Sequence, residues 1–301
     1  MTRWANRPSW LVIGLVIVGG GCQEAEETGA DALPPPRAVI SLGTVPGDAL
    51  LEAIGPAGGN VLAALQQIRD DAAKRRGGKS ERLDSDDPLV RIVEGENGTV
   101  SELYLQGIYL TDESLPLLAE VNGLKRLHLH KAPVTDAGLA RLTRLDQLTG
   151  LSLGRLDVTD EGLAHLSAFS SLRRLVVEGP RISVAGTRQI GRLEQLEGLG
   201  LSGLGITNEA LASIGGLVRL KLLSLSGTAV GDGGLIHLAA LKNLAVLNLS
   251  ETRVSDLGLK PLEDLKSLKL LRLDATRVTA EGIVPLQRAL PGCRIAVRQL
   301  R

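Results

Sequence analysis

The strongest constraint on how this chain can fold is a 24-residue period that runs over residues 100–291 without insertion or deletion. Eight copies align in register, with starts at Val100, Leu124, Leu148, Leu172, Leu196, Leu220, Leu244 and Leu268. Positions 1, 4, 6, 11, 16, 19 and 22 of the eight copies make 56 sites, and 55 of them are apolar, the exception being Thr187. Because only 44% of the whole chain is hydrophobic, the period predicts a repetitive architecture.

The spacing within one copy predicts a short strand, a turn and a helix. In the second copy Leu127 and Leu129 alternate with polar residues, which sends both leucines to one side of a strand. Thr135 or Asp136 can then cap a helix whose apolar residues recur at every third position. A small residue recurs at position 15, which indicates a close approach between successive turns: Ser114, Gly138, Gly162, Gly186, Ala210, Gly234, Gly258 and Gly282.

The copies follow approximately LxxLxLxxTxVTDxGLxxLxxLxx, and this pattern resembles a leucine-rich repeat. The resemblance implies an α/β fold, a right-handed leucine-rich repeat solenoid with a parallel concave sheet and convex helices. Stacking is required because no single copy can bury its leucines alone. We expect eight repeats over 100–291, a C-terminal cap over 292–301, and a mostly helical N-terminal capping region over 38–99 with a helix at 60–76 and a strand at 89–93.

The first 22 residues, MTRWANRPSWLVIGLVIVGGGC, combine a basic start with an apolar run from Trp10 to Val18, as is typical of a signal peptide. The glycines directly before Cys22 resemble the lipobox of bacterial lipoproteins. This resemblance implies a lipid on Cys22 and a cell-envelope location, lipid-anchored to a bacterial membrane on its periplasmic or outer side. The alternatives are an uncleaved membrane anchor and an ordinary signal peptide with an incidental Cys. Residues 23–37 are acidic and Pro-rich, which predicts a disordered, extended tether.

Two features depart from the family pattern. Many leucine-rich repeats carry Asn at position 9, whereas this chain has Thr228, Thr252 and Thr276 in late copies and mostly apolar residues in early ones. A ladder of polar side chains is therefore expected only in the C-terminal copies. The fourth copy, 172–195, departs most, with Val184 in place of Asp, and a local irregularity is expected there.

No motif in the sequence predicts catalysis, so we expect neither enzymatic activity nor a cofactor. Residues 77–80, GGKS, resemble the end of a phosphate-binding loop. The first Gly of that motif would fall at Ala73, inside the helix expected at 60–76, so the interpretation is disfavoured. No HExxH pattern is present.

The histidines and cysteines do not predict a metal site either. His128 and His130 lie on one strand without a predictable third ligand. His165 and His237 occupy the same helix position three repeats apart, too far from each other to share a ligand. Cys293 is expected to be a small buried residue rather than a reactive thiol.

Polar strand residues on the expected concave face form the candidate partner-binding surface: Tyr104, Arg126, His128, His130, Arg155, Arg174, Glu178, Asn248 and Arg272. The N-terminal end of this surface is predicted to be basic, whereas later copies offer small and apolar side chains such as Leu222 and Val246. An aromatic and arginine cluster suits an acidic patch on a protein or glycan. The whole chain has 34 basic and 34 acidic residues, and this balance argues against nucleic acid as a partner.

The leading hypothesis is a monomeric, lipid-anchored protein-binding module whose concave face binds an unknown protein. One alternative is a structural scaffold of the envelope without a specific ligand. The VTDxGL pattern also resembles that of eukaryotic F-box substrate adaptors, which act in ubiquitin-dependent proteolysis. That alternative is disfavoured because no F-box-like helical module is recognisable before Val100 and because the chain begins like a secreted protein.

Overall fold

The computed structural model describes residues 39–43, 89–94, 99–106, 111–113, 115–121, 123–179, 182–202 and 205–298. The predicted signal peptide, Cys22, the tether, the helix expected at 60–76 and the GGKS motif lie outside the described residues. The chain divides into two compact units. Unit 1 comprises Met1–Val158 and Ala168–Ser171, and unit 2 comprises Thr159–Ser167 and Leu172–Arg301.

Unit 1 combines an antiparallel entry with parallel turns. Its strands are β1 (Val39–Gly43), β2 (Leu89–Glu94), β3 (Val100–Gln106), β4 (Arg126–His130) and β5 (Gly150–Gly154), and its helices are η2 (Leu115–Glu120) and α4 (Asp136–Leu142). β1, β2 and β3 pair antiparallel, whereas β3, β4 and β5 pair parallel in chain order. The strand expected at 89–93 is therefore confirmed. β1 is a strand that the sequence did not predict within the region expected to be mostly helical.

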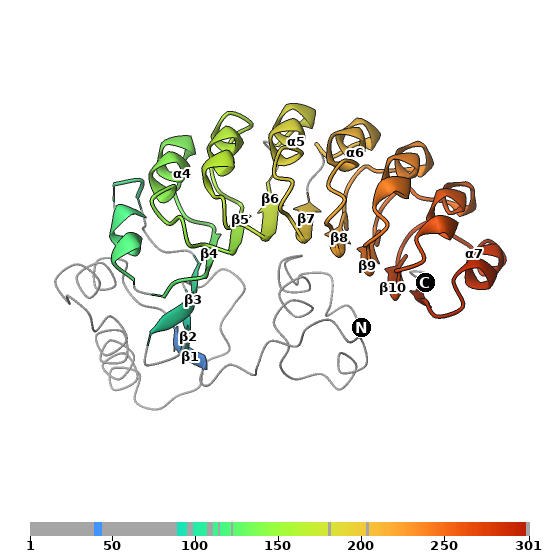
Figure 1. Ribbon diagram of the computed structural model, residues 1–301, viewed down its shortest axis with the longest axis horizontal. Coiled ribbons are helices and arrows are strands. Elements are labelled where there is room, and N and C mark those ends of the chain that lie inside the picture. The colour runs from blue at the N-terminus through green and yellow to red at the C-terminus, as the bar shows by residue number, and fades with distance from the viewer. Residues whose placement is uncertain are drawn as a thin grey trace. The chain divides into compact units, whose positions relative to one another are not determined.

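Unit 2 consists of parallel turns. Its strands are β6 (Arg174–Glu178), β7 (Gly198–Ser202), β8 (Leu222–Ser224), β9 (Val246–Asn248), β10 (Leu270–Arg272) and β11 (Arg294–Ala296). Its helices are η3 (Gly162–Ala168, of which residues up to 167 belong to this unit), α5 (Val184–Ile190), α6 (Asn208–Ile214), η4 (Asp232–Ala240), η5 (Asp256–Gly258), η6 (Lys260–Asp264) and α7 (Ile283–Ala289). The strands line the inner side of the arc that unit 2 forms, and the helices line its outer side (Figure 1).

The register follows the sequence period. Leu270 of β10 pairs with Val246 of β9 and with Arg294 of β11, each 24 residues away in the sequence. The leucines of the pattern point away from the open strand face and are closed off from solvent, as Leu199 and Leu223 show with 0% exposure. The fold class is therefore the α/β leucine-rich repeat solenoid that the sequence predicted.

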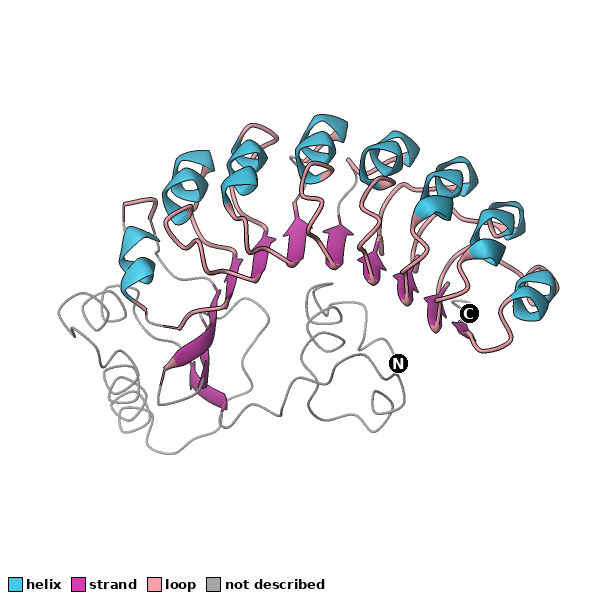
Figure 2. Cartoon of the chain, in the orientation of Figure 1, coloured by secondary structure: helices cyan, strands magenta, loops and turns pink. Residues whose placement is uncertain are grey.

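Short helices connect the successive strands from β3 to β11 (Figure 2). α4, α5, α6 and α7 are α-helical, whereas the elements from η2 to η6 are 3₁₀-helices. A 3₁₀-helix closes its hydrogen bonds over three residues and suits segments of about one or two turns. The expected cap is confirmed in α4, where the Thr135 side chain accepts a hydrogen bond of 3.2 Å from the backbone N–H of Ala137.

The VTDxGL motif connects one turn to the next. The Asp232 carboxylate accepts hydrogen bonds from the backbone N–H (2.7 Å) and the hydroxyl (2.6 Å) of Ser255, which lies in the following turn. A Cβ at Gly258, also in the following turn, would collide with the same carboxylate. The close approach predicted from position 15 is confirmed. The Asp of one turn bonds to the Thr or Ser of the next turn and lies against the Gly of that turn. We call this series of contacts the aspartate ladder, and it explains why position 15 is small.

The polar ladder at position 9 is also present, although its bonds lie within each turn. The hydroxyls of Thr228, Thr252 and Thr276 donate to the carbonyls three residues earlier, at 2.7, 2.6 and 2.7 Å. In the fourth copy the out-of-pattern Thr187 is fully buried, and its hydroxyl donates to the carbonyl of Val184 at 2.8 Å. The core therefore tolerates this hydroxyl because its hydrogen bond is made locally.

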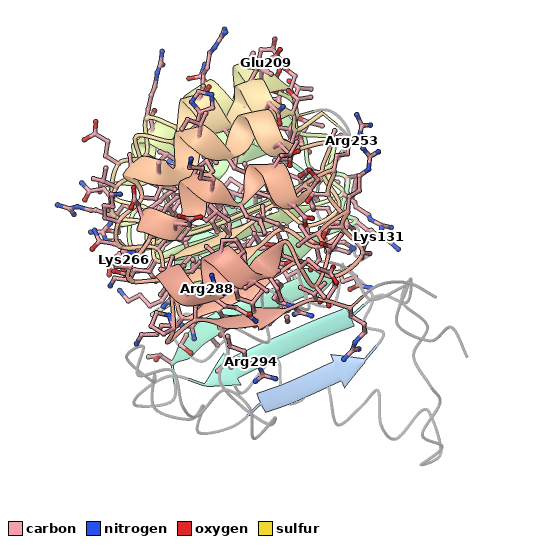
Figure 3. The ribbon with its side chains drawn as sticks, turned by 90° about the vertical axis from the view of Figure 1, so that its right-hand side faces the viewer. Lys131, Glu209, Arg253, Lys266, Arg288 and Arg294 are labelled. Carbon is pink, nitrogen blue, oxygen red and sulfur yellow. The ribbon has the colours of Figure 1, made fainter. Side chains whose placement is uncertain are left out.

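Charged side chains such as Glu209, Lys266 and Arg288 point away from the stack when unit 2 is viewed from its C-terminal end (Figure 3). Within the part of the chain that the structure describes, no helix is both long and apolar enough to cross a bilayer.

Candidate functional site

Four polar residues meet on the strand face of unit 1, and we call them the Glu102 cluster: Glu102, Tyr104, Arg126 and His128. The parallel register pairs Glu102 with Arg126 and Tyr104 with His128 on the neighbouring strands β3 and β4. These residues alternate with leucines that point into the core, so all four side chains lie on the opposite face. The register alone therefore brings an acid, a base and two aromatic rings together.

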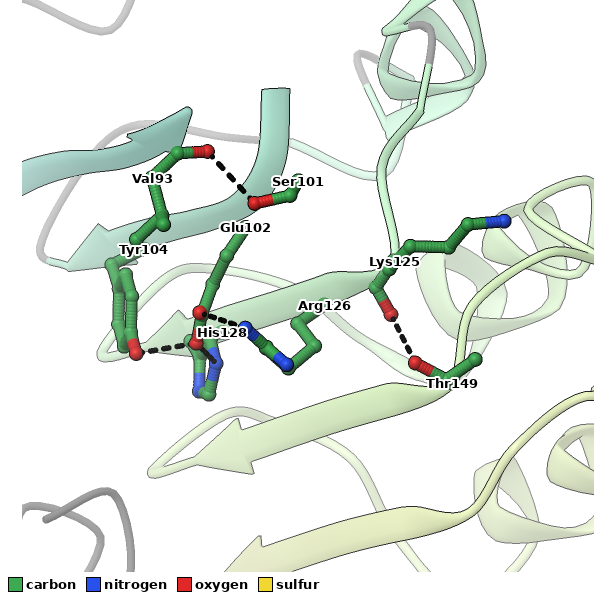
Figure 4. Close-up of polar contacts among 8 residues, drawn as sticks. All are labelled: Val93, Ser101, Glu102, Tyr104, Lys125, Arg126, His128 and Thr149. Carbon is green, nitrogen blue, oxygen red and sulfur yellow. Dashed lines mark hydrogen bonds and ion pairs between the residues drawn. The ribbon is translucent and has the colours of Figure 1, made fainter. Parts of the chain in front are cut away.

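The cluster is built around a buried carboxylate (Figure 4). Glu102 is 0% exposed, and its Oε1 accepts a hydrogen bond of 2.5 Å from the Tyr104 hydroxyl and lies 2.9 Å from Nε2 of His128. Its Oε2 lies 2.8 Å from the guanidinium of Arg126. The Tyr104 and His128 rings stack with centroids 4.0 Å apart and an interplanar angle of 8°.

These contacts determine the charge of the cluster. Burial by itself raises the pKa of Glu102, but the hydrogen bond from His128, the positive charges of His128 and Arg126 and the bond from Tyr104 outweigh it. Together they lower the pKa of Glu102 to about 2. The carboxylate is ionised at neutral pH and compensates the charge of Arg126. The N-terminal end of the strand face is therefore less basic than the sequence predicted.

Sequence reasoning missed Glu102, although a signal for it was present. Glu102 occupies position 3 of the first copy, the position that Arg126 holds in the second. Parallel strands in register place equal positions side by side. A comparison of position 3 between successive copies therefore pairs the two residues from the amino-acid sequence alone.

Several of the predicted binding residues are buried on the strand face. Tyr104 is 6% exposed, His130 is 6% exposed and Asn248 is 8% exposed. The side-chain oxygen of Asn248 accepts a hydrogen bond of 3.0 Å from the backbone N–H of Ser250. These groups take part in the internal packing and hydrogen bonding of the strand face.

The basic side chains of β4 lie across the next strand. A Cβ at Gly150 would come within 3.0 Å of the Arg126 side chain, and one at Gly154 would collide with the His130 ring. The glycines of β5 therefore leave room for these two side chains to lie flat. The side chains of Arg126 and His130 on β4 therefore cover part of the neighbouring strand β5.

The remaining predicted residues are spread over both units. Arg155 in unit 1 is exposed and has a positive φ of 51°. In unit 2, Arg174 and Glu178 lie partly exposed on β6. Arg272 is 37% exposed and lies 3.4 Å from the Asp274 carboxylate. The structure thus brings Tyr104, Arg126 and His128 of the predicted set together around Glu102, and His130 lines one small pocket with Tyr104 and His128.

Unit 2 carries a different kind of surface on its strand face, which we call the aliphatic row: Leu222, Val246 and Leu270. The three residues are register partners on β8, β9 and β10, and each is partly exposed. Exposed Lys221 and Lys269 precede the two leucines. The sequence predicted small and apolar side chains here, and the register makes the aliphatic ones adjacent.

The described residues offer little for metal or thiol chemistry. They contain no group of three or more His, Cys, Asp or Glu side chains that could hold a metal ion. His165 and His237 are exposed on η3 and η4. Cys293 is partly exposed and not buried as the sequence predicted. Its partial burial still raises the pKa of the thiol to about 11, which keeps it protonated and poorly nucleophilic at neutral pH.

Comparisons with known proteins add one structural likeness. No protein-family model matches the chain, and no curated protein matches it. Among solved structures, the chain is similar to an internalin from Listeria monocytogenes, with 14% sequence identity and a TM-score of 0.33 over 68% of this chain and 85% of that one.

Proposed function

We propose that this protein is a protein-binding module whose partner contacts the strand face of unit 2, and that a lipid on Cys22 holds it in the bacterial cell envelope. The observation that carries the first part is the aliphatic row. Aliphatic side chains left partly exposed in register on an open sheet form a contact surface with few charges, as the centres of protein interfaces do.

The chemistry of the strand face favours unit 2 over the Glu102 cluster as the contact. Arg126 and His128 already contact Glu102, and a partner would have to replace those bonds at a desolvation cost. Leu222, Val246 and Leu270 lose only water when a partner covers them. At the rim, Lys221 already pairs with Glu197 at 3.0 Å, whereas the exposed Lys269 favours an acidic group on the border of the partner.

The experiment places a photo-crosslinking residue at Val246 in cells that produce the chain and identifies what is captured. The purified partner is then titrated against the Val246→Glu variant. We expect about a hundredfold loss of affinity, because the change buries a charge at the centre of the contact. Ile236→Glu is the matched control, since Ile236 is 59% exposed on η4, on the helical side.

Equal affinity of both variants would exclude the aliphatic row as the contact. If no protein crosslinks at residue 246 and Val246→Glu cells behave like the parent, the chain acts as an envelope scaffold instead. The lipid is tested separately, by metabolic labelling with an alkyne fatty acid. Label on the parent chain and none on Cys22→Ala is the expected result, and label on both would refute the assignment of Cys22.

A further inference from the structure

The aliphatic row lies on a part of the sheet that has no open edge. β8, β9 and β10 each pair with a neighbouring strand on both sides, so their backbone N–H and C=O groups are used within the sheet. Two residues further along β8 and β9, Ser224 and Asn248 are buried, and the side-chain oxygen of Asn248 already accepts a bond from Ser250. A partner segment that covers the aliphatic row therefore finds few hydrogen-bonding groups there.

The backbone of such a segment has to satisfy its own polar groups, because a buried N–H or C=O group without a hydrogen bond is costly. An extended segment forms no hydrogen bonds within itself, and β8, β9 and β10 offer it no free strand edge to pair with. An α-helix bonds its backbone groups internally, apart from those at its two ends. A helix can therefore cover the row at a lower cost than an extended chain.

The spacing of the row also fits a helix that crosses the strands. Neighbouring strands lie about 4.8 Å apart, so Leu222, Val246 and Leu270 follow one another at about that step and span about 10 Å. Residues i, i+3 and i+7 of a helix advance by about 4.5 and 10.5 Å along its axis. Alternate residues of an extended chain advance by about 6.7 Å and reach about 13 Å after two steps. The stripe of a helix thus stays in step with the row, and an extended chain does not.

Two charges of opposite sign lie at opposite edges of this surface. Lys269 directly precedes β10 and Glu251 follows β9, and the two strands are parallel. Both side chains are exposed, and neither forms an ion pair or a side-chain hydrogen bond with a residue that the structure describes. Neighbouring charges are already paired with each other: Lys221 with Glu197, and Arg272 with Asp274. The surface therefore favours a segment with acidic groups on one flank and basic groups on the other.

We propose that the partner contributes an amphipathic α-helix that lies across β8, β9 and β10. Its aliphatic stripe covers the aliphatic row, its acidic flank faces Lys269 and its basic flank faces Glu251. This inference rests on the proposed function, which assigns the aliphatic row to a protein partner. It adds the conformation and the charge pattern of the segment that binds.

The test asks whether helices or extended peptides bind the full chain more tightly. Two phage-displayed libraries carry the same number of randomised residues, one on a single face of a helix in a small three-helix domain and one in a linear peptide held extended between prolines. Both are selected against the full chain, and the affinities of the purified binders are measured. We expect the tighter binders from the helical library, with aliphatic residues at i, i+3 or i+4, and i+7.

The same variants as above locate these binders. Their affinity should fall about a hundredfold with Val246→Glu and stay unchanged with the control Ile236→Glu. Thermal melting confirms that each variant is folded. Should Val246→Glu unfold, Val246→Ala replaces it, with about a fivefold loss expected from the smaller apolar contact.

A charge swap tests the orientation of the helix. Lys269→Glu should weaken a helical binder about fivefold, and exchanging the facing acidic residue of the binder for lysine should restore the affinity. Lys260→Glu is the matched control, since Lys260 is exposed on η6, on the helical side. Equal losses in the two variants would contradict the orientation that we propose.

Two further results would overturn the helix. Linear peptides that bind as tightly as the helices and lose affinity with Val246→Glu would refute the helix but leave the aliphatic row as a protein contact. Binders that are insensitive to Val246→Glu, or no binders from either library, would refute the inference as a whole. The photo-crosslinking at residue 246 tests the proposed function independently, so the two failures are separate outcomes.

Discussion

The strand faces of the two units use the same backbone positions for different purposes. In unit 1, positions 3 and 5 of β3 and β4 carry Glu102, Arg126 and the stacked rings of Tyr104 and His128, and these groups contact one another. In unit 2, position 3 of β8, β9 and β10 carries the aliphatic row, and position 5 of β8 and β9 carries the buried polar residues Ser224 and Asn248. The difference teaches that charge in a sequence does not by itself mark a binding surface. A charge that is paired and buried stabilises the fold, and a partly exposed aliphatic side chain remains available.

The largest expected effect comes from removing the carboxylate of the Glu102 cluster. Glu102→Ala leaves the guanidinium of Arg126, 18% exposed, without its counter-charge and removes the acceptor for Tyr104 and His128. We expect a loss of about 4 kcal/mol in the free energy of unfolding, measured by urea titration with circular dichroism. Val246→Ala, on the strand face of unit 2, is the control and should cost less than about 1 kcal/mol. Similar losses in both variants would remove the contrast between the two faces.

A pH titration measures the same cluster without deleting it. The pKa of Glu102 is about 2 in the folded chain against an ordinary value of 4.5. A lowered folded pKa gives stability that is fully present above pH 4.5 and lost as the pH falls through 2. The size of this contribution is about 3 kcal/mol. Glu102→Gln should lack this part of the pH dependence, so the difference between the two unfolding profiles should shrink between pH 4.5 and pH 2. A constant difference across that window would show that Glu102 is not held ionised.

The aspartate ladder is present in both units. It can therefore test whether the hydrogen bonds between successive turns stabilise the two units equally. Asp112 in unit 1 contacts the backbone N–H of Thr135 at 2.9 Å, and Asp232 in unit 2 makes the equivalent bond to Ser255 at 2.7 Å. Asp112→Ala and Asp232→Ala should each lower the free energy of unfolding by about 2 kcal/mol, because each strands a backbone donor and a hydroxyl. Asp146→Ala, an exposed change outside the motif, is the control. A large effect in one unit only would mean that the units differ in the bonds between their turns as well as in the residues on their strand faces.

How far the sequence predicted this structure depends on whether a feature is periodic. The period determined which leucines are buried, where strands recur and why position 15 is small, because every turn repeats the same contacts. The Glu102 cluster occurs once in the described residues, at the junction of the antiparallel strands with the first parallel turns. The repeated pattern of residue types does not show it, and only a comparison of position 3 between neighbouring copies pairs Glu102 with Arg126. The aspartate ladder was predictable only in part. The residues of the ladder are part of the VTDxGL motif. The hydrogen bond from Ser255 to Asp232 could not be predicted from that motif alone, because it forms between the motifs of two successive turns.

The smallest expected effect concerns Val184, which with Ala280 is one of two residues at position 13 in unit 2 that break the motif. Val184 stands where six of the seven other copies carry Asp or Asn, and Thr207 of the next turn has no side-chain capping bond. Val184→Asp should supply an acceptor for the N–H and hydroxyl of Thr207, as Asp160 does for Ser183, and should raise the free energy of unfolding by about 1 kcal/mol. The same change with Thr207→Val should gain less, because the hydroxyl is gone. No gain in the single variant would mean that the fourth copy differs from the others in backbone geometry, and that its valine is suited to that geometry rather than a lost aspartate.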